Sequence, residues 1–510
     1  MPLDHVGQEG VIELSHIDPE LLPAEHFFTK APLNASLLIA NISPLPRTLY
    51  RGTLVGRFVP LHLSSTALAT LTTDGTRTTL EMPVPVEASD NPPPLATRIA
   101  PGTRLTPTQL RRLKELLERN ADLVSTLSDP GKTDLLPFKI DTGEARPIRR
   151  PPYRNPREAD FIDQVVEEKV RQGLIQRSTS EWSFPVIVVR DPGKKPRVCV
   201  DYRLLNEVTK TDAYVLPRQD DTLDALGGAT IFSTLDLARG FHQQVVDPAS
   251  RPKTAFSTRR GLWEWTRLPF GVKNGPASFQ RLMQLVLQKV CWKCCLLHLD
   301  DIIVYSRSFE AHLHHLQEVF DALRHAGLRV RSENFHLGAH SISYLGHIIS
   351  PEGIRVDPEK TQGITDFARP TTYRQLRRFL GMDNYHRRFV EHYAALAAPL
   401  TDLLKNPEDP KRVQPLAWND KAARSFVALK AALTRAPLLA YLDYKGPFTL
   451  ATDASAVATG ATIFQEDTEG SLRPIAYASH RSTGAQVNWS IPEKELFALV
   501  HAARVFRPYL

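Results

Sequence analysis

The stretch that decides the fold is LLHLDDIIVY, residues 296–305. Two apolar runs flank the pair Asp300-Asp301, which is the pattern of a β-hairpin whose tight turn carries two acids. Adjacent carboxylates repel each other, and burying them is unfavourable unless a cation or a hydrogen-bond donor compensates their charge. The pair is therefore either an ordinary turn that faces water or part of a site that holds cations, and the hairpin alone leaves both interpretations open.

A third acid, Asp236, follows another apolar run, IFSTL at residues 231–235. If this strand and the hairpin lie in one sheet, the three acids meet at one end of it. Hard carboxylate oxygens in such an arrangement suit Mg²⁺. A pair of these ions, about 3.5–4 Å apart, can activate an attacking oxygen and stabilise a leaving one. The three acids together favour the cation site over the water-facing turn.

The composition is that of a multidomain globular protein. The chain has 510 residues, of which 42% are hydrophobic and 23% are charged, so three or four domains of roughly 100–200 residues each are expected. The formal net charge of +7 suits a polyanionic partner, although many proteins that bind no nucleic acid share it.

The sequence predicts an intracellular protein, in a cytoplasmic particle or the nucleus, that is neither secreted nor membrane-bound. Four cysteines, three of them bunched at residues 291–295, do not form the pattern of a disulfide framework. The first residues show no charged segment followed by an apolar one, as a signal peptide would. No apolar run approaches the roughly 18 residues that a membrane span needs.

Four segments, in order along the chain, resemble the reverse transcriptases of gypsy-type long-terminal-repeat retrotransposon polyproteins. PRVCVDYRLLN (196–206) resembles the fingers strand, and STLDL (233–237) resembles the strand with the first metal ligand. LPFGVKNGPASFQ (268–280) resembles the LPFG…PAFQ segment, and LDDIIVYS (299–306) resembles the YxDD-box hairpin. The similarity extends over roughly residues 140–510.

The resemblance implies an α+β fold: a right-hand polymerase with fingers, palm and thumb, and a partial ribonuclease H-like α/β domain at the C-terminus. The expected divisions are a β-rich N-terminal polyprotein connector (1–100), a helix and extended linker (101–150), fingers and palm (151–350), thumb and connection (351–435), and the truncated ribonuclease H-like domain (436–510).

The implied activity is that of an RNA-directed DNA polymerase, which transfers nucleotides from dNTPs to the 3′-hydroxyl of a primer on an RNA or DNA template. Asp236, Asp300 and Asp301 would hold two Mg²⁺ ions, or Mn²⁺ in their place, together with the backbone carbonyl of Leu237. No oligomeric state follows from the resemblance.

The resemblance also implies a nucleotide pocket. Fixed positive groups near the triphosphate stabilise transition-state charge, and an aromatic ring under the sugar would exclude a 2′-hydroxyl. The family pattern gives the first role to Lys195 and Arg197, the second to Phe241, and the pocket floor to Phe270, Gly271 and Lys273. Core packing is the alternative for the two phenylalanines, and a solvated hairpin tip is the alternative for Lys195 and Arg197.

One position departs from the family pattern. The box usually has Tyr or Phe two residues before its first Asp, and this chain has His298. A ring is retained, so primer positioning can survive. The departure leaves a second hypothesis open, in which the chain is a catalytically inactive remnant that binds nucleic acid without copying it.

A second set of acids resembles the start of a ribonuclease H domain. Asp453 lies in FTLATDAS (448–455) and Glu495 in IPEKELFAL (491–499), where the family has two metal-binding acids. An exposed acid at a strand end is the alternative for Asp453. No Asp or Glu follows Glu495, so we expect this chain alone to lack ribonuclease H activity.

Other motifs carry weaker signals. Asp141-Thr142-Gly143 matches the D-T-G of aspartic proteases, but the polar residues after it do not form the apolar strand of a protease core. Cys291, Cys294, Cys295 and His298 are more typical of a buried approach to the hairpin than of a zinc site. The histidines at 312, 314 and 315 are predicted to be exposed. The arginines between 374 and 388 could follow nucleic-acid phosphates or form a solvated face.

Overall fold

The computed structural model describes most of the chain after residue 104. The described ranges are 105–126, 130–154, 156–190, 196–405, 416–467 and 469–510, without the side chains of 332–334, and the short strands before residue 61. The chain forms two compact units, Met1–Pro85 and Val86–Leu510. The described strands of the first unit are β1 (Gly10–Glu13), β2 (Leu21–Pro23), β3 (Phe27–Phe28), β4 (Ile39–Asn41) and β5 (Arg57–Pro60).

The larger unit opens with α1 (Pro107–Arg119). The Thr106 hydroxyl caps it by accepting a hydrogen bond from the Gln109 N–H, and Gln109 Oε1 accepts one from the Thr106 N–H. Two otherwise unpaired backbone donors are satisfied in this way. Leu113 and Leu117 are buried on one face. The helix lies within the range 101–150, where one is expected from the sequence.

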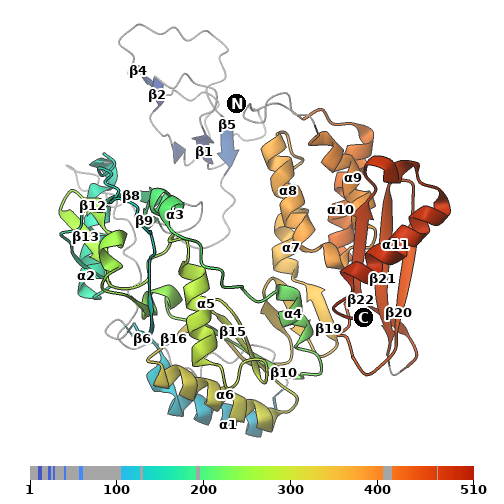
Figure 1. Ribbon diagram of the computed structural model, residues 1–510, viewed down its shortest axis with the longest axis horizontal. Coiled ribbons are helices and arrows are strands. Elements are labelled where there is room, and N and C mark those ends of the chain that lie inside the picture. Colours follow the sequence, from blue (N-terminus) through green and yellow to red (C-terminus); the bar gives the residue numbers. More distant parts are fainter. Residues whose placement is uncertain are drawn as a thin grey trace. The chain divides into compact units, whose positions relative to one another are not determined.

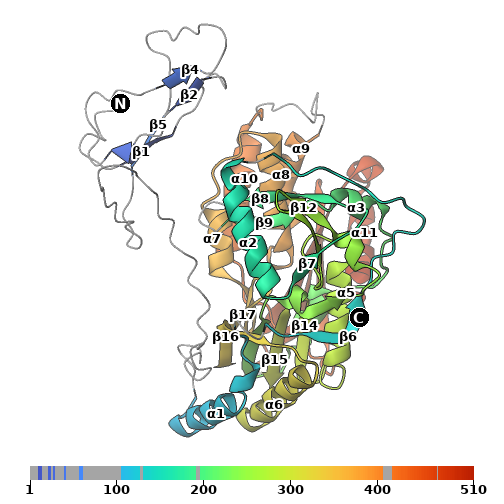
Figure 2. The ribbon, with the colours of Figure 1, turned by 90° about the vertical axis from the view of Figure 1, so that its left-hand side faces the viewer.

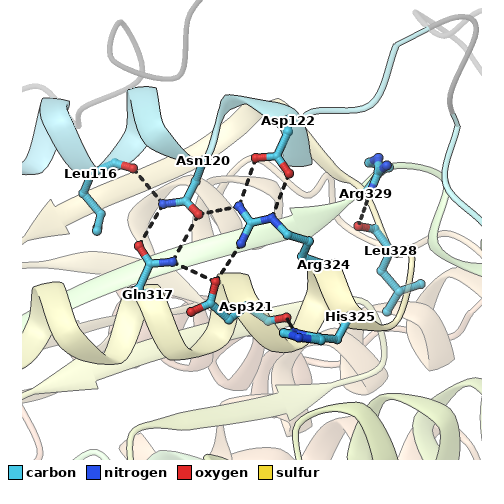
Figure 3. Close-up of polar contacts among 9 residues, drawn as sticks. All are labelled: Leu116, Asn120, Asp122, Gln317, Asp321, Arg324, His325, Leu328 and Arg329. Carbon is cyan, nitrogen blue, oxygen red and sulfur yellow. Dashed lines mark hydrogen bonds and ion pairs between the residues drawn. The ribbon is translucent and has the colours of Figure 1, made fainter.

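Helix α1 lies beside α6 (Phe309–His325) (Figures 1 and 2). Arg324 of α6 donates to both carboxylate oxygens of Asp122, at 2.8 and 2.9 Å, and to Asn120 Oδ1 at 2.6 Å (Figure 3). Asn120 is buried and also donates to the Leu116 carbonyl. This network fixes the end of α1 against the helix that follows the acidic hairpin.

A four-stranded sheet carries the predicted acids. Its order is β14-β15-β10-β16, with β14 spanning Cys295–His298, β15 Asp301–Ser306, β10 Ile231–Leu237 and β16 Val330–Ala339. Helices α5 (Gly275–Val286) and α6 pack against it. The predicted hairpin, with its turn at the two acids, is confirmed.

A second sheet has five strands, of which three precede β10 in sequence and two lie between β10 and β14. Its order is β7-β13-β12-β8-β9, and α2 runs alongside β7 (Figure 2). The bounds are α2 Ala159–Arg171, β7 Ile175–Arg177, β8 Phe184–Val189, β9 Arg197–Val200, β12 Phe256–Thr258 and β13 Gly261–Trp265. The other elements of this part of the chain are α3 (Arg203–Val208), α4 (Gln219–Asp224) and the parallel pair β6 (Thr133–Phe138) and β11 (Gln244–Val246).

A small sheet and a group of helices follow. The sheet contains β17 (Ile342–Tyr344), β18 (His347–Ser350) and β19 (Gly353–Val356), so the predicted division at 350/351 falls in the turn of one hairpin. The helices are α7 (Pro358–Thr365), α8 (Tyr373–Tyr385), α9 (Tyr393–Leu403) and α10 (Asp420–Thr434). They share a core of their own, which includes Leu376, Phe379 and Leu429.

The last region is a three-stranded antiparallel sheet covered by a helix. The strands are β20 (Phe448–Ala454), β21 (Ala458–Glu466) and β22 (Leu472–Arg481), and α11 (Ile491–Val505) contacts β20 and β21. Ala498 and Ala502 are buried there because small side chains let the helix approach the strands. Across the described residues, no helix has the length and apolarity needed to cross a membrane.

Candidate active site

Strand register brings the predicted acids to one end of the four-stranded sheet. Asp236 on β10 lies directly opposite Asp301 on β15. Residues opposite each other in an antiparallel pair have side chains on the same face. Asp300 occupies the turn immediately before Asp301, and His298 closes the hairpin as the partner of Asp301 on β14. Acids separated by more than sixty residues in sequence are therefore neighbours in the fold.

The turn is held by a buried glutamine. Leu299 has a left-handed backbone with φ +60°, an uncommon conformation for a side-chain-bearing residue. Its N–H donates to Gln280 Oε1 at 2.7 Å, and Gln280 is fully buried on α5. The hydrogen bond satisfies an amide that the β14–β15 ladder leaves out, so Gln280 fixes the backbone that presents Asp300.

Gly240 leaves room for the acidic turn. A Cβ at this position would lie 3.2 Å from Asp300 Cβ and 3.1 Å from Phe279 Cζ. These distances are tighter than ordinary van der Waals contact, so a side chain at residue 240 would displace one of the two neighbours. The absent side chain is thus a packing requirement of the site.

The acids make this end of the sheet strongly negative. Burial raises the pKa of Asp300, and the nearby Asp236 adds to that effect. Burial, followed by the charges of Asp300 and Asp236, raises the pKa of Asp301 to about 6 even though this side chain still reaches solvent. A bound cation would relieve both effects by compensating the charge.

The oxygen atoms of the three acids and of the Leu237 carbonyl are chemically suited to a hard divalent cation. Carboxylate and carbonyl oxygens are the ligands that Mg²⁺ prefers, and Leu237 and Asp236 both line the same cavity. In the described part of the chain, no three His, Cys, Asp or Glu side chains are gathered closely enough to hold a metal ion. A cation would therefore have to draw the carboxylates together from the positions they occupy.

A cavity of about 450 Å³ opens in front of Asp236 and Asp300. Its other lining residues come from α2 and its C-cap, from β10 and the segment after it, from the segment before α5, and from β16; they are Val165, Glu168, Lys169, Gln172, Leu237, Arg239, Gly240, His242, Phe270 and Arg331. The cavity joins the acidic end of the four-stranded sheet to a helix of the preceding region. Its volume lies in the range of small-molecule sites.

Three cationic residues of this cavity were not predicted from the sequence. Arg331 lies opposite Asp236 on β16. Arg239 has a left-handed backbone with φ +53° and donates to Gln172 Oε1 at 2.7 Å. Burial, with Arg239 nearby, lowers the pKa of Lys169. Helical spacing could have placed Lys169 on the same face as Val165 and Gln172. Nothing in the sequence indicates that Arg239 and Arg331 reach the same cavity.

The two predicted aromatic residues occupy different environments. Phe270 is 57% exposed and lines the cavity. Phe241 is stacked on Phe270, with ring centroids 5.2 Å apart, and packs against Phe279 at the same distance on another side. Phe241 therefore supports Phe270 from behind, and in this conformation core packing describes it better than direct contact with the cavity.

Gly271 and Lys273 form a turn clamped by Asn206. The Asn206 side chain donates to the Gly271 carbonyl and accepts from the Lys273 N–H, both at 2.8 Å. Gly271 has φ +90°, a conformation that favours glycine. The Lys273 ammonium donates to the Thr209 carbonyl at 2.8 Å, so it ties two loops together here and does not line the cavity.

Arg197, one of the two predicted triphosphate ligands, lies on another element. Arg197 is the exposed first residue of β9, opposite Val189 of β8. It does not line the cavity in front of the acids. Lys195 lies outside the described residues.

A family model described as reverse transcriptase (RNA-dependent DNA polymerase) matches residues 189–349, the region that contains the acidic hairpin and the cavity-lining loops. This chain carries a reverse transcriptase domain. A second model, described as an RNase H-like domain found in reverse transcriptase, matches residues 418–510. The resemblance and the α+β polymerase fold inferred from the sequence are confirmed.

Curated relatives of the reverse transcriptase domain are retrotransposon polyproteins. The Pol polyprotein from transposon 297 of Drosophila melanogaster is 40% identical over 354 residues, covering 68% of this chain and 32% of that protein. The Pol polyprotein from transposon gypsy of the same organism is 35% identical over 364 residues, covering 69% and 35%. The chain thus spans about a third of the length of these relatives.

Solved structures show the same fold. The foamy viral protease-reverse transcriptase in complex with dsDNA is 26% identical with a TM-score of 0.73, covering 81% of this chain and 85% of that one. The same viral protein in complex with an RNA/DNA hybrid is 26% identical with a TM-score of 0.70, covering 81% and 54%.

The ribonuclease H-like domain holds its two predicted acids on elements that touch. Asp453 is exposed on β20, and Glu495 is half-buried on α11, which packs against β20. Among the described residues, they do not belong to any group of three or more side chains suited to a metal ion.

Two weaker motifs are explained by the reverse transcriptase fold. Asp141 accepts from the Gly143 N–H at 2.8 Å and pairs with Lys210 at 3.0 Å, so the D-T-G forms a turn in which Asp141 and Gly143 are exposed and Thr142 is buried. The exposure predicted for His312 is wrong. It is fully buried, within 2.7 Å of Ser233 Oγ and 2.9 Å of Ser306 Oγ, because it faces serines of the sheet that satisfy both ring nitrogens.

Proposed function

We propose that this chain is an RNA-directed DNA polymerase that transfers nucleotides from dNTPs to a primer 3′-hydroxyl and releases pyrophosphate. The observation that carries the proposal is the placement of Asp236 opposite Asp301, with Asp300 beside them at the mouth of a cavity. The similar foamy viral protein was solved with dsDNA and with an RNA/DNA hybrid, which supports a primed RNA or DNA template as the partner.

Asp236, Asp300, Asp301 and the Leu237 carbonyl would hold two Mg²⁺ ions, or Mn²⁺ in their place. Such ions would supply an activated 3′-hydroxyl and charge stabilisation for the leaving pyrophosphate. The protein's part is positional: Gln280 holds the acidic turn through Leu299, and the preformed register fixes the acids against each other. The backbones that carry the acids are held in place in this way, so cation binding would need to move only the carboxylate side chains.

The nucleotide would enter the cavity. Phe270 offers an exposed ring, with Phe241 stacked behind it, and the Asn206-clamped turn at Gly271 supports that ring's backbone. Lys169, Arg239 and Arg331 supply positive charge along the cavity wall. Such charge favours a triphosphate and stabilises its transition state. Lys195 and Arg197 would add positive charge for the triphosphate, as the family pattern implies.

Primer extension on poly-A with oligo-dT, dTTP and Mg²⁺ tests the proposal. We expect incorporation by the wild-type chain and a loss on the order of a thousandfold in Asp301→Asn, because a missing ligand removes transition-state stabilisation. Asp134→Asn is the matched control, since Asp134 is exposed on β6, outside the cavity. Equal incorporation by Asp301→Asn and the control would overturn the proposal.

The inactive remnant is the second candidate, and His298 favours it. Its Nδ1 is buried without a hydrogen-bond partner, and burial lowers its pKa, so the ring is neutral and poorly satisfied at the hairpin. A wild-type chain that binds the primed template and incorporates nothing would select this function. Recovery of incorporation in His298→Tyr would then assign the defect to this residue.

For the ribonuclease H-like domain we propose an incomplete metal site on Asp453 and Glu495. Two acids supply fewer ligands than hydrolysis by paired cations requires. We expect the chain alone to leave the RNA strand of a labelled RNA/DNA hybrid intact in Mg²⁺. Cleavage that disappears in Asp453→Asn would contradict this.

A further inference from the structure

The turn between α5 and β14 brings two cysteines together. Trp292, with φ +65°, reverses the chain, and its N–H donates to the Cys295 carbonyl at 2.9 Å. The Cys295 N–H donates to the Val290 carbonyl at 3.4 Å. These two bonds make Cys291 and Cys295 partners in a β-bridge. Bridged backbones lie about 4.7–4.9 Å apart, inside the roughly 4.4–6.8 Å Cα range of disulfides.

The two sulfurs differ in access and acidity. Cys291 is half-buried, whereas Cys294 and Cys295 are buried. The Cys291 and Cys295 thiols lie within hydrogen-bonding reach, and this contact lowers the pKa of Cys291 while it raises that of Cys295. Burial raises the pKa of Cys294 to about 11. The sulfur that a small oxidant can reach is therefore the one favoured as a thiolate, which is the reactive form.

We propose that Cys291 and Cys295 are a redox-modification site that hydrogen peroxide converts reversibly into a disulfide. The Cys291 thiolate attacks one peroxide oxygen; the S–O bond forms, the O–O bond breaks, and hydroxide leaves and takes up a proton. The Cys295 thiol then loses its proton and attacks the Cys291 sulfur, and the sulfenic oxygen departs as water. Two thiols and one peroxide thus give one disulfide and two waters.

Backbone geometry selects Cys295 over Cys294 as the resolving residue. The Cys294 thiol is turned to the Val290 carbonyl at 3.8 Å, and Cys294 is not the bridge partner of Cys291. The turn is also bound to β15, since Tyr305 Oη donates to the Trp292 carbonyl at 3.3 Å and the Tyr305 N–H to the Cys294 carbonyl at 2.9 Å. A disulfide would therefore form without moving the hairpin.

Peptide mapping of the full-length chain tests this site. Trypsin cleaves after Lys289, Lys293 and Arg307. Cys291 therefore falls on peptide 290–293, whereas Cys294 and Cys295 fall on peptide 294–307. After peroxide treatment of the native protein, alkylation and digestion, we expect the two peptides to be linked, with fragmentation placing the bond at Cys295. Dithiothreitol should separate them.

Three variants sharpen the assignment. Cys294→Ser should keep the link, Cys295→Ser should abolish it, and Cys199→Ser, a half-buried cysteine on β9, should leave it unchanged. A bond mapped to Cys294, cross-links between chains, irreversible sulfinic acid without a link, or unreacted thiols would each overturn the proposal. The wild-type map decides the matter even where Cys295→Ser fails to fold.

Discussion

The chain carries two sets of acids that are built differently. In the reverse transcriptase domain, Asp236 and Asp301 face each other across adjacent strands, and Asp300 sits in a turn fixed by a buried side chain. In the ribonuclease H-like domain, Asp453 is exposed on a strand and Glu495 is half-buried on the helix that covers it. Burial, with the charge of the neighbouring acids, raises the pKa of Asp300 and of Asp301, and the first set borders a cavity.

The difference shows what makes carboxylates into a site. Acidic residues at suitable sequence positions are present in both domains. Only the first set also has a register that forces proximity, a turn locked by Gln280, and a glycine that gives the turn room. Repulsion within such a set is tolerated when a ligand compensates it, so enforced proximity points to a cation.

Among substitutions that keep all three acids, the largest expected effect comes from filling the space beside the acidic turn. Gly240→Val would push its side chain into Phe279 and Asp300. We expect primer extension to fall about a hundredfold, because displacements near an ångström cost about that much in catalysis. Gly363→Val is the control, since nothing lies within 4 Å of a Cβ at this exposed position in α7. Equal activity of the two variants would show that the turn does not need this space.

A smaller effect is expected from releasing the lock on the turn. Gln280→Leu leaves the Leu299 N–H without its partner, and an unsatisfied buried amide costs about 1–3 kcal/mol. We predict a roughly tenfold drop in the turnover of primer extension with little change in template affinity. Gln284→Leu, on the same helix but bonded to Tyr214, should leave turnover near that of the wild type. A Gln280→Leu enzyme with unaltered turnover would remove this residue from the site.

The smallest effect concerns stability without metal. The pKa of Asp301 is raised from 3.8 to about 6 in the folded chain, so the folded state binds a proton more tightly than the unfolded state does. This contribution to stability is present below about pH 4 and is lost as pH rises through 6. In EDTA, Asp301→Asn should therefore melt slightly above the wild type at pH 7.5, and the gap should close at pH 4.5. Added Mg²⁺ should raise the melting temperature of the wild type alone.

Sequence patterns predicted the elements that depend on local spacing. The apolar runs around Asp300-Asp301 gave the hairpin, and the motif order gave the approach of Asp236. These features were predictable because turn chemistry and strand alternation are encoded within a few residues.

Features that depend on distant partners were not predictable in this way. His312 lies next to the apolar stripe of α6, but its burial depends on Ser233, which is 79 residues away. The sequence predicts Lys273 in the pocket floor but does not indicate that its ammonium bonds the Thr209 carbonyl. Arg331 is part of the site only because β16 places it opposite Asp236 of β10. Each case is a tertiary contact that a single sequence does not display.

In the proposed site, three acids far apart in sequence form one cation pocket. Calorimetric titration of Mn²⁺ into the full chain with a primed template, after subtraction of binding to nucleic acid alone, measures whether they act together. We expect Asp236→Asn to lose high-affinity binding as completely as Asp301→Asn, while Asp134→Asn binds like the wild type. Retention of wild-type Mn²⁺ affinity in Asp236→Asn, with loss in Asp301→Asn, would contradict it.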